Sequence, residues 1–138
     1  MNEVELTYYG EVTAKKNSKQ IIWNRRTGSP MIISSRRAKS QEGSMVEAFA
    51  SDAYLEGWEC GLPRAESTFK ITINIWNKDK RRRDLDNQAT AILDALVLAG
   101  VIPDDNVAFV PWLKVEYKGI DKENPRAVIK IKEIAWQV

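Results

Sequence analysis

Residues 68–99 read TFKITINIWNKDKRRRDLDNQATAILDALVLA and carry the two clearest secondary-structure signals in the chain. Over residues 68–76, Phe and Ile side chains alternate with Thr, Lys and Asn, which predicts a strand with one buried face. Over residues 87–99, apolar side chains recur at the spacing of one helix face: Ala89, Ile92, Leu93 and Leu96. Gly100 follows at the position of a left-handed C-terminal cap, and Pro103 prevents the helix from continuing. The sequence therefore predicts a strand, a basic loop and a helix in succession.

Strand-like patterns also occur on both sides of this stretch. Apolar and polar residues alternate over 113–117 and over 127–131, which predicts two further strands. Segments 20–23 and 31–34 flank the turn-rich sequence NRRTGSP, which predicts a β-hairpin with two arginines at its tip.

A second helix is predicted over residues 44–56. The side chains expected on its buried face are Met45, Ala48, Phe49, Ala53 and either Tyr54 or Leu55. Ser40 or Ser44 is the expected N-cap. Because helices and strands do not alternate regularly along the chain, we expect the α+β class. The predicted architecture is a single small domain over residues 1–138, with a mixed or antiparallel sheet and two main helices.

The composition excludes several classes of chemistry. The chain has 138 residues, no histidine and one cysteine, Cys60. It therefore cannot form a Ser-His-Asp triad, a His-ligated zinc site or an internal disulfide. No apolar run approaches the ~20 residues of a membrane span, and the first ten residues lack the pattern of a signal peptide. We expect a cytoplasmic protein with no membrane partner, whose chemistry uses carboxylates, amines, hydroxyls or a metal.

The small net charge of +2 conceals a strong segregation of charge. Residues 12–41 contain eight basic residues and no acidic one, and residues 78–83 contain five basic residues and one acidic residue. The remainder of the chain is therefore net acidic. A surface that combined the two basic segments would attract a polyanion such as the phosphate backbone of a nucleic acid. The alternative is that both segments are simply solvated loops.

Asp84 and Asp86 form a candidate metal site. They are two residues apart in backbone expected to be extended, so their carboxylates should point to the same side. Such a pair can share Mg²⁺, which prefers oxygen ligands and can activate water against a phosphodiester. The structural alternative is that Asp86 caps the helix, Asp84 pairs with Arg82 or Arg83, and the acids at 104–105 form a solvent-facing turn. Residue spacing leaves both interpretations open.

Several segments together resemble the core signature of the RusA family of Holliday-junction resolvases. They are KRRRDLDN at 80–87, AILDAL at 91–96, AG at 99–100 and DD at 104–105. The resemblance in residue type and spacing covers about 80–107, and the strand pattern extends it loosely over 69–133. The N-terminal third is similar only as basic sequence around Lys16-Asn-Ser.

This resemblance implies a homodimeric, Mg²⁺-dependent endodeoxyribonuclease of DNA recombination and repair that makes paired nicks in four-way junctions. It assigns the catalytic carboxylates to Asp84, Asp86 and Asp105, with Asp104 as a further metal ligand. We expect the DNA-binding residues to come from the two basic segments: Lys15, Lys16, Lys19, Arg25, Arg26, Lys80, Arg81, Arg82 and Arg83. The alternative function is a non-catalytic protein that binds branched DNA in a phage recombination or replication system.

One position departs from the family pattern. The family places a lysine four residues after the second Asp of DLD, where this chain has Thr90. A lysine there could stabilise charge on the phosphate or the leaving oxygen. Candidates for the missing cation are Lys80, Arg83 and Lys114.

The predicted helix also separates the acidic residues. A helix over 87–99 is roughly 20 Å long, so Asp104 and Asp105 follow its far end. The chain would have to return almost straight along the helix, or a two-fold dimer with antiparallel helices would have to place these acids beside the partner's DLD segment. The surplus apolar residues near the helix end suit either a dimer contact or core packing: Val97, Leu98 and Val101.

Overall fold

The computed structural model describes residues 3–13, 19–24, 26–34, 36–58 and 68–134, with the backbone alone for 19–24, 30–34 and 36–39. Its elements in chain order are β1 (Glu3–Tyr9), β2 (Lys19–Asn24), β3 (Ser29–Ser34), α1 (Arg36–Leu55), β4 (Thr68–Asn77), α2 (Leu85–Leu98), β5 (Trp112–Ile120) and β6 (Arg126–Ile134). The predicted α+β class is confirmed.

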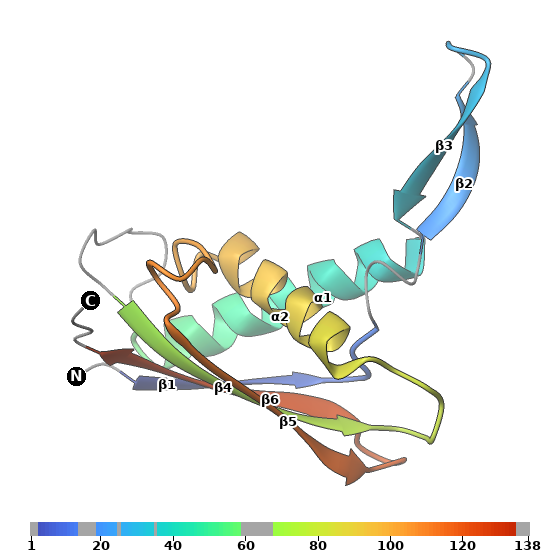
Figure 1. Ribbon diagram of the computed structural model, residues 1–138. Helices are drawn as coiled ribbons and strands as arrows, with labels where there is room; N and C mark the ends of the chain where they lie inside the picture. The colour runs from blue at the N-terminus through green and yellow to red at the C-terminus, as the bar shows by residue number, and fades with distance from the viewer. Residues whose placement is uncertain (1–2, 14–18, 25, 35, 59–67, 135–138) are drawn as a thin grey trace.

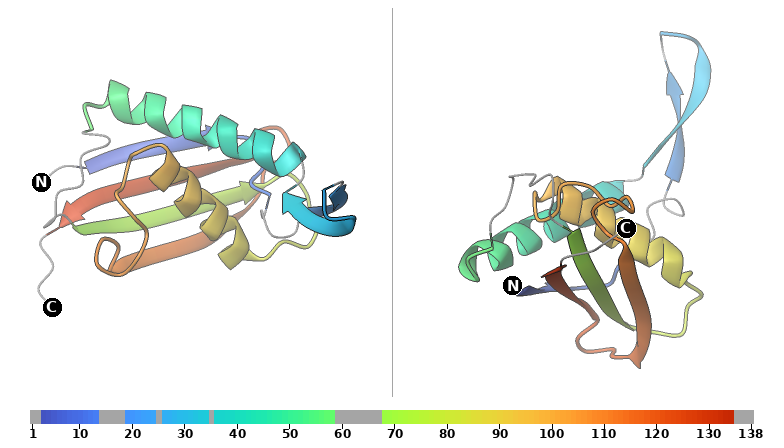
Figure 2. Two further views of the ribbon diagram at one scale, coloured as in Figure 1. Left: turned by 90° about the horizontal axis from the view of Figure 1, so that it is seen from above. Right: turned by 60° about the vertical axis from the view of Figure 1, so that its left-hand side comes forward.

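Four strands form one mixed sheet in the order β1-β6-β4-β5. The β4–β5 pair is parallel, and β4–β6 and β1–β6 are antiparallel. Both helices cover the same face of this sheet, with α1 along β1 and α2 crossing the side formed by β4 and β5, and no helix of the described residues lies on the opposite face (Figures 1 and 2). The residues described therefore form two layers with the core between them.

The core follows the predicted periodicities closely. Side chains that point from β4 and β6 toward the helices are almost completely buried: Phe69, Ile71, Ile73, Ile75, Ala127, Ile129 and Ile131. α2 supplies Ala89, Ile92 and Leu96 to the same core, as its 3.6-residue pattern predicts. Gly100 has φ +74°, which confirms the left-handed residue after this helix.

Two parts of the fold differ from the sequence-based expectation. The first helix begins at Arg36, not near residue 44, so neither Ser40 nor Ser44 is its N-cap. The additional residues, RRAKSQEG, contain no large apolar side chain, so no hydrophobic periodicity marks them as helical. At the other end of the helix, Tyr54 and Leu55 are exposed because the buried stripe ends at Ala53.

Strand β1 was not predicted. Its sequence EVELTYY alternates polar and apolar residues over 3–8, and the strand pairs with β6, which lies more than a hundred residues away in the sequence. Val4 and Leu6 are its buried residues. The alternation over residues 3–8 was therefore a usable strand signal that the sequence analysis missed.

The predicted hairpin is confirmed as β2 and β3, which pair with each other in a separate two-stranded sheet. It projects from the end of the molecule where α1 begins, away from the four-stranded sheet (Figure 1). Arg26 is exposed in the turn between the strands, and Arg25 lies outside the described residues.

No helix in the described part of the chain is long and apolar enough to cross a membrane.

Candidate active site

The loop that joins β4 to α2 borders a depression of about 390 Å³. Four consecutive cations line this depression together with neighbouring residues from β4, α2 and β5: Asn77, Asp79, Lys80, Arg81, Arg82, Arg83, Leu85, Gln88 and Tyr117. Because the N-terminus of α2 also carries partial positive charge, the depression is electrostatically suited to a phosphate.

Asp84 and Asp86 lie at the start of α2. Asp84 is the N-cap residue, with extended backbone and no side-chain capping bond, and Asp86 lies in the first helical turn. The expectation that both stand in extended backbone is therefore wrong for Asp86, because the helix begins two residues earlier than predicted. Asp84 accepts only a long hydrogen bond from Asn87 Nδ2, at 3.3 Å, and its side chain is 49% exposed.

The alternative interpretation, in which Asp84 pairs with a neighbouring arginine, is supported only by one long contact. Arg82 Nε lies 4.0 Å from Asp84 Oδ1, and the Arg82 side chain is almost fully exposed. Exposed pairs at this distance contribute little to stability. The carboxylates of Asp84 and Asp86 therefore remain open to solvent and to a ligand.

Asp104 and Asp105 form an exposed turn after α2. Asp104 Oδ1 accepts a hydrogen bond from the Asp105 backbone N–H at 2.7 Å, and Asp104 Oδ2 accepts one from Asn106 Nδ2 at 3.1 Å. These acids follow the C-terminal end of α2, whereas Asp84 and Asp86 stand at its N-terminal end (Figure 1). The helix has 14 residues and is thus roughly 21 Å long. Within the described residues, no three acidic or cysteine side chains converge on a metal-sized site.

The predicted DNA-binding cations fall into distinct groups. Lys80, Arg81 and Arg82 are exposed beside the depression, as a phosphate contact requires. Only the backbone of Lys19 is described, on β2. Two further predicted residues, Lys15 and Lys16, lie outside the described residues, as Arg25 does.

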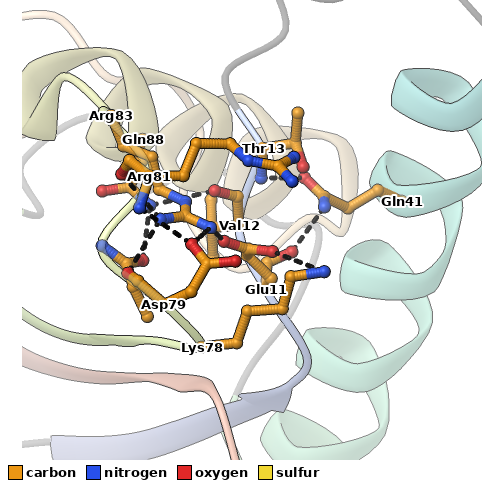
Figure 3. Close-up of polar contacts among 10 residues, drawn as sticks. Glu11, Val12, Thr13, Gln41, Lys78, Asp79, Arg81, Arg83 and Gln88 are labelled. Atoms are coloured by element: carbon orange, nitrogen blue, oxygen red, sulfur yellow. Dashed lines mark hydrogen bonds and ion pairs between the residues drawn. The ribbon is translucent and has the colours of Figure 1, made fainter. Parts of the chain in front are cut away.

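Arg83 differs from the other three cations that line the depression. Its side chain is only 12% exposed, and its guanidinium contacts both Asp79 and Glu11 (Figure 3). Burial lowers the pKa of the Arg83 guanidinium, and nearby Tyr117 opposes this effect. Arg83 therefore uses donors inside the protein, whereas Lys80, Arg81 and Arg82 are exposed.

Thr90 does not take the place of the family lysine. Its hydroxyl donates a hydrogen bond to the backbone oxygen of Asp86, 2.9 Å away in its own helix. Of the candidate replacements, Arg83 has internal partners, and Lys114 pairs with Thr72 on the sheet face that carries no helix. Lys80 is exposed beside the depression.

Sequence reasoning missed the polar residues that support this loop. Gln88 is fully buried, and its Nε2 donates to Val12 O and to Asn77 Oδ1, both at 2.9 Å. A signal for Gln88 did exist, because a polar residue on the buried stripe of α2 requires internal partners. No sequence signal marks Glu11, whose partner Arg83 is far away along the chain.

The model of the family described as endodeoxyribonuclease RusA matches residues 16–132, which is most of the chain. The chain belongs to the RusA endodeoxyribonuclease family. The match includes the basic loop, α2, the Asp104–Asp105 turn and most of β6, so all the predicted RusA-type carboxylates lie inside it. No curated protein matches the chain. Membership in the RusA family supports a nuclease that acts on DNA junctions.

Proposed function

We propose that this protein is a Mg²⁺-dependent, homodimeric resolvase that cleaves four-way DNA junctions by paired nicks. The observation that carries the proposal is the pair of exposed carboxylates, Asp84 and Asp86, which directly follow in sequence the cations lining a depression in a RusA-family chain. The carboxylates are suited to a hard metal ion, and the cations beside them are suited to the phosphates of the substrate.

The donor set fits magnesium in its chemistry. Asp84 and Asp86 offer only oxygen ligands, and no strong internal hydrogen bond or close ion pair occupies the Asp84 carboxylate. Mg²⁺ is bound in proteins by one or a few carboxylates and retains positions for water and substrate oxygens. A bound Mg²⁺ would supply Lewis-acid activation of water and of the phosphate.

In the proposed reaction, water adds across one phosphodiester. A bond forms between the water oxygen and phosphorus, one P–O ester bond breaks, and the departing oxygen receives a proton. Lys80 is the residue of this chain that we assign to stabilise charge on the phosphate, because it is exposed beside the depression and Thr90 cannot carry that charge. Arg81 and Arg82 would hold neighbouring phosphates of the same strand.

A second copy of the chain supplies the missing acids in this proposal. Asp105 and Asp104 lie at the wrong end of α2 to join Asp84 within one subunit. If two copies pack with their α2 helices antiparallel, each Asp104–Asp105 turn comes beside the partner's Asp84 and Asp86. Two such composite sites, related by symmetry, suit paired nicks in a four-way junction.

The flank formed by α2 and the edge strand β5 is the face that we assign to this contact. Large apolar side chains are exposed on it or next to it: Leu98 (61%), Val107 (83%), Leu113 (44%) and Tyr117 (47%). β5 has β4 as its only partner in the described sheet, so its other edge is open. Val101, by contrast, is buried and belongs to the core, and Val97 is partly buried against it.

The proposal is tested by incubating the purified protein with a synthetic four-way junction, with and without Mg²⁺. We expect symmetric nicks that require the metal, and no comparable cleavage of a linear duplex of the same sequence. Binding of the junction without cleavage at any Mg²⁺ concentration would contradict the proposed activity.

A further inference from the structure

A largely buried carboxylate lies under the basic loop. Glu11 follows β1, its side chain is 9% exposed, and its Oε1 faces Arg83 Nη2 (Figure 3). Its other oxygen, Oε2, lies 3.4 Å from Lys78 Nζ. Glu11 therefore contacts cations at both ends of the segment 78–83, which leads directly into Asp84.

Arg83 forms hydrogen bonds with other residues of the segment 78–83. Its Nη1 donates hydrogen bonds to the backbone oxygens of Arg81, at 2.8 Å, and of Asp79, at 3.2 Å. Its Nη2 donates to Asp79 Oδ1 at 2.8 Å. These contacts shape the loop but are all local, whereas the contact with Glu11 joins the loop to the N-terminal part of the chain.

The backbone on either side of Glu11 is itself anchored. Gln41 of α1 accepts a hydrogen bond from the Thr13 N–H at 2.8 Å and donates one to the Glu11 backbone oxygen at 2.5 Å. Gln88 of α2 donates to the backbone oxygen of Val12 at 2.9 Å. The carboxylate of Glu11 is thus presented from a segment that both helices hold in place.

We propose that Glu11 is a positioning residue of the nuclease site: through Arg83 it fixes the loop 78–83 and hence the orientation of Asp84. The inference rests on the proposed function for the role of Asp84, but its contacts are independent of that role. Glu11 also precedes the family match, which begins at residue 16. Its partners Lys78 and Arg83 lie inside the match, so the contact joins the matched segment to a residue that precedes it.

The physical reason is the cost of a largely buried cation whose charge is less fully compensated, since only the local, more exposed Asp79 remains as an acidic partner. If Glu11 loses its charge, the guanidinium of Arg83 is left largely out of solvent without its long-range partner. The side chain gains by turning outward to water, and this movement releases the two backbone oxygens that it holds. The residue that follows, Asp84, then samples more orientations.

The test uses Glu11→Gln, which preserves shape and removes charge. We expect kcat for junction cleavage to fall by about 10- to 100-fold, the usual effect of losing a group that orients a site residue, while KM stays within about twofold. Amide hydrogen exchange should accelerate in residues 79–86 and remain unchanged in β4 and β6. A merely structural role would accelerate exchange throughout the sheet and leave kcat unchanged at temperatures where the protein is folded.

A matched control is Asp121→Asn. Asp121 Oδ2 accepts a 2.8 Å bond from Arg126 Nη1, and Arg126 also donates to a loop backbone oxygen, so the pair has the same chemistry in a different loop. This variant should leave kcat and exchange in 79–86 at the wild-type values. An equal loss of kcat in both variants would overturn the proposal.

Glu11→Asp is a second variant, which retains the negative charge on a side chain that is shorter by one methylene. We expect it to recover part of the lost kcat and to show intermediate exchange in 79–86. Wild-type kcat and exchange in both Glu11 variants would refute the positioning role. If the wild-type protein does not cleave junctions, the proposed function fails, and local exchange in 79–86 still decides whether Glu11 holds the loop.

Discussion

The two acidic segments at the ends of α2 are held in different ways. Asp84 follows a loop that Arg83 closes internally and Glu11 ties to the N-terminal segment, and buried Gln88 braces the same end of the helix. Asp104 and Asp105 stand in an exposed turn whose described hydrogen bonds join near neighbours in the sequence. The acids at the N-terminal end are thus supported by contacts with distant segments, whereas the Asp104–Asp105 turn is held by hydrogen bonds between its own neighbours.

This difference indicates different roles for the two ends of α2. The N-terminal end can position carboxylates and phosphate-binding cations within a single subunit, because contacts from distant parts of the chain fix it. The C-terminal end presents acids on a solvent-facing turn, next to the exposed apolar residues Leu98 and Val107. In the proposed homodimer, packing of a second subunit would bring this turn to the metal site.

The largest expected effect comes from substitutions at the N-terminal end of α2. Asp84→Asn and Asp86→Asn should each abolish cleavage, by about 10³-fold or more, because each removes a ligand charge from the metal site. Junction binding should be preserved or strengthened, since repulsion of the DNA phosphates decreases.

Gel-shift titration and junction cleavage, measured on the same preparations, separate these two effects. Binding that falls in parallel with cleavage would argue against a metal site at Asp84 and Asp86.

The second prediction tests whether Asp84 of one subunit and Asp105 of the other belong to the same site in the proposed homodimer. When Asp84→Asn protein is mixed with Asp105→Asn protein and the subunits exchange, each heterodimer should contain one composite site with both acids intact. At equal, random mixing, nicking should return to about a quarter of the wild-type number of active sites. Each variant alone should be inactive.

The matched control for this mixture combines Asp84→Asn with Asp86→Asn, which lie in the same segment and cannot restore each other. If the Asp84→Asn and Asp105→Asn mixture also stays inactive after verified exchange, the site is completed within one chain.

The third prediction concerns the cations of the loop that precedes α2. Arg81→Ala and Arg82→Ala should weaken junction affinity and reduce the slope of log affinity against log salt by about one per lost phosphate contact. Arg83→Lys should leave that slope unchanged, because Arg83 is engaged with Glu11 and Asp79. Fluorescence anisotropy across a salt series measures the slopes. A similar change in all three variants would place Arg83 on the DNA after all.

The smallest effects on cleavage are expected for Gln88 and Asn106, whose side-chain amides form hydrogen bonds at the two ends of α2. These two residues also allow the most direct comparison of the ends. Gln88→Ala should lower the free energy of unfolding by about 1–3 kcal/mol, because it leaves the buried Val12 and Asn77 oxygens without their donor. Asn106→Ala removes exposed hydrogen bonds and should cost about 0.5 kcal/mol or less. Urea unfolding of both variants gives the two values, and equal values would remove the contrast between the ends.

Much of the fold could be predicted from local patterns. The alternation in β4 and β6 and the 3.6-residue period of α2 each identify an element and its buried face. The DLD segment and the later acid pair were assigned through the resemblance to the RusA family, and the adjacent cations through the count of charges by segment. The beginning of α1 was not predicted, because its polar turns carry little periodic signal. β1 was also missed, although its residues 3–8 alternate as a strand should.

The sequence by itself determined the α+β class, the principal strands and helices, the segregation of charge and the RusA-family signature, since all of these are properties of neighbouring residues. Only the tertiary structure decided that Arg83 turns inward to Glu11 and that Val101 is buried while Leu98 is exposed. It also decided how the two acidic segments are held at opposite ends of α2. Burial and ion pairing depend on which distant segments meet, and such meetings are set by the packing of the whole chain.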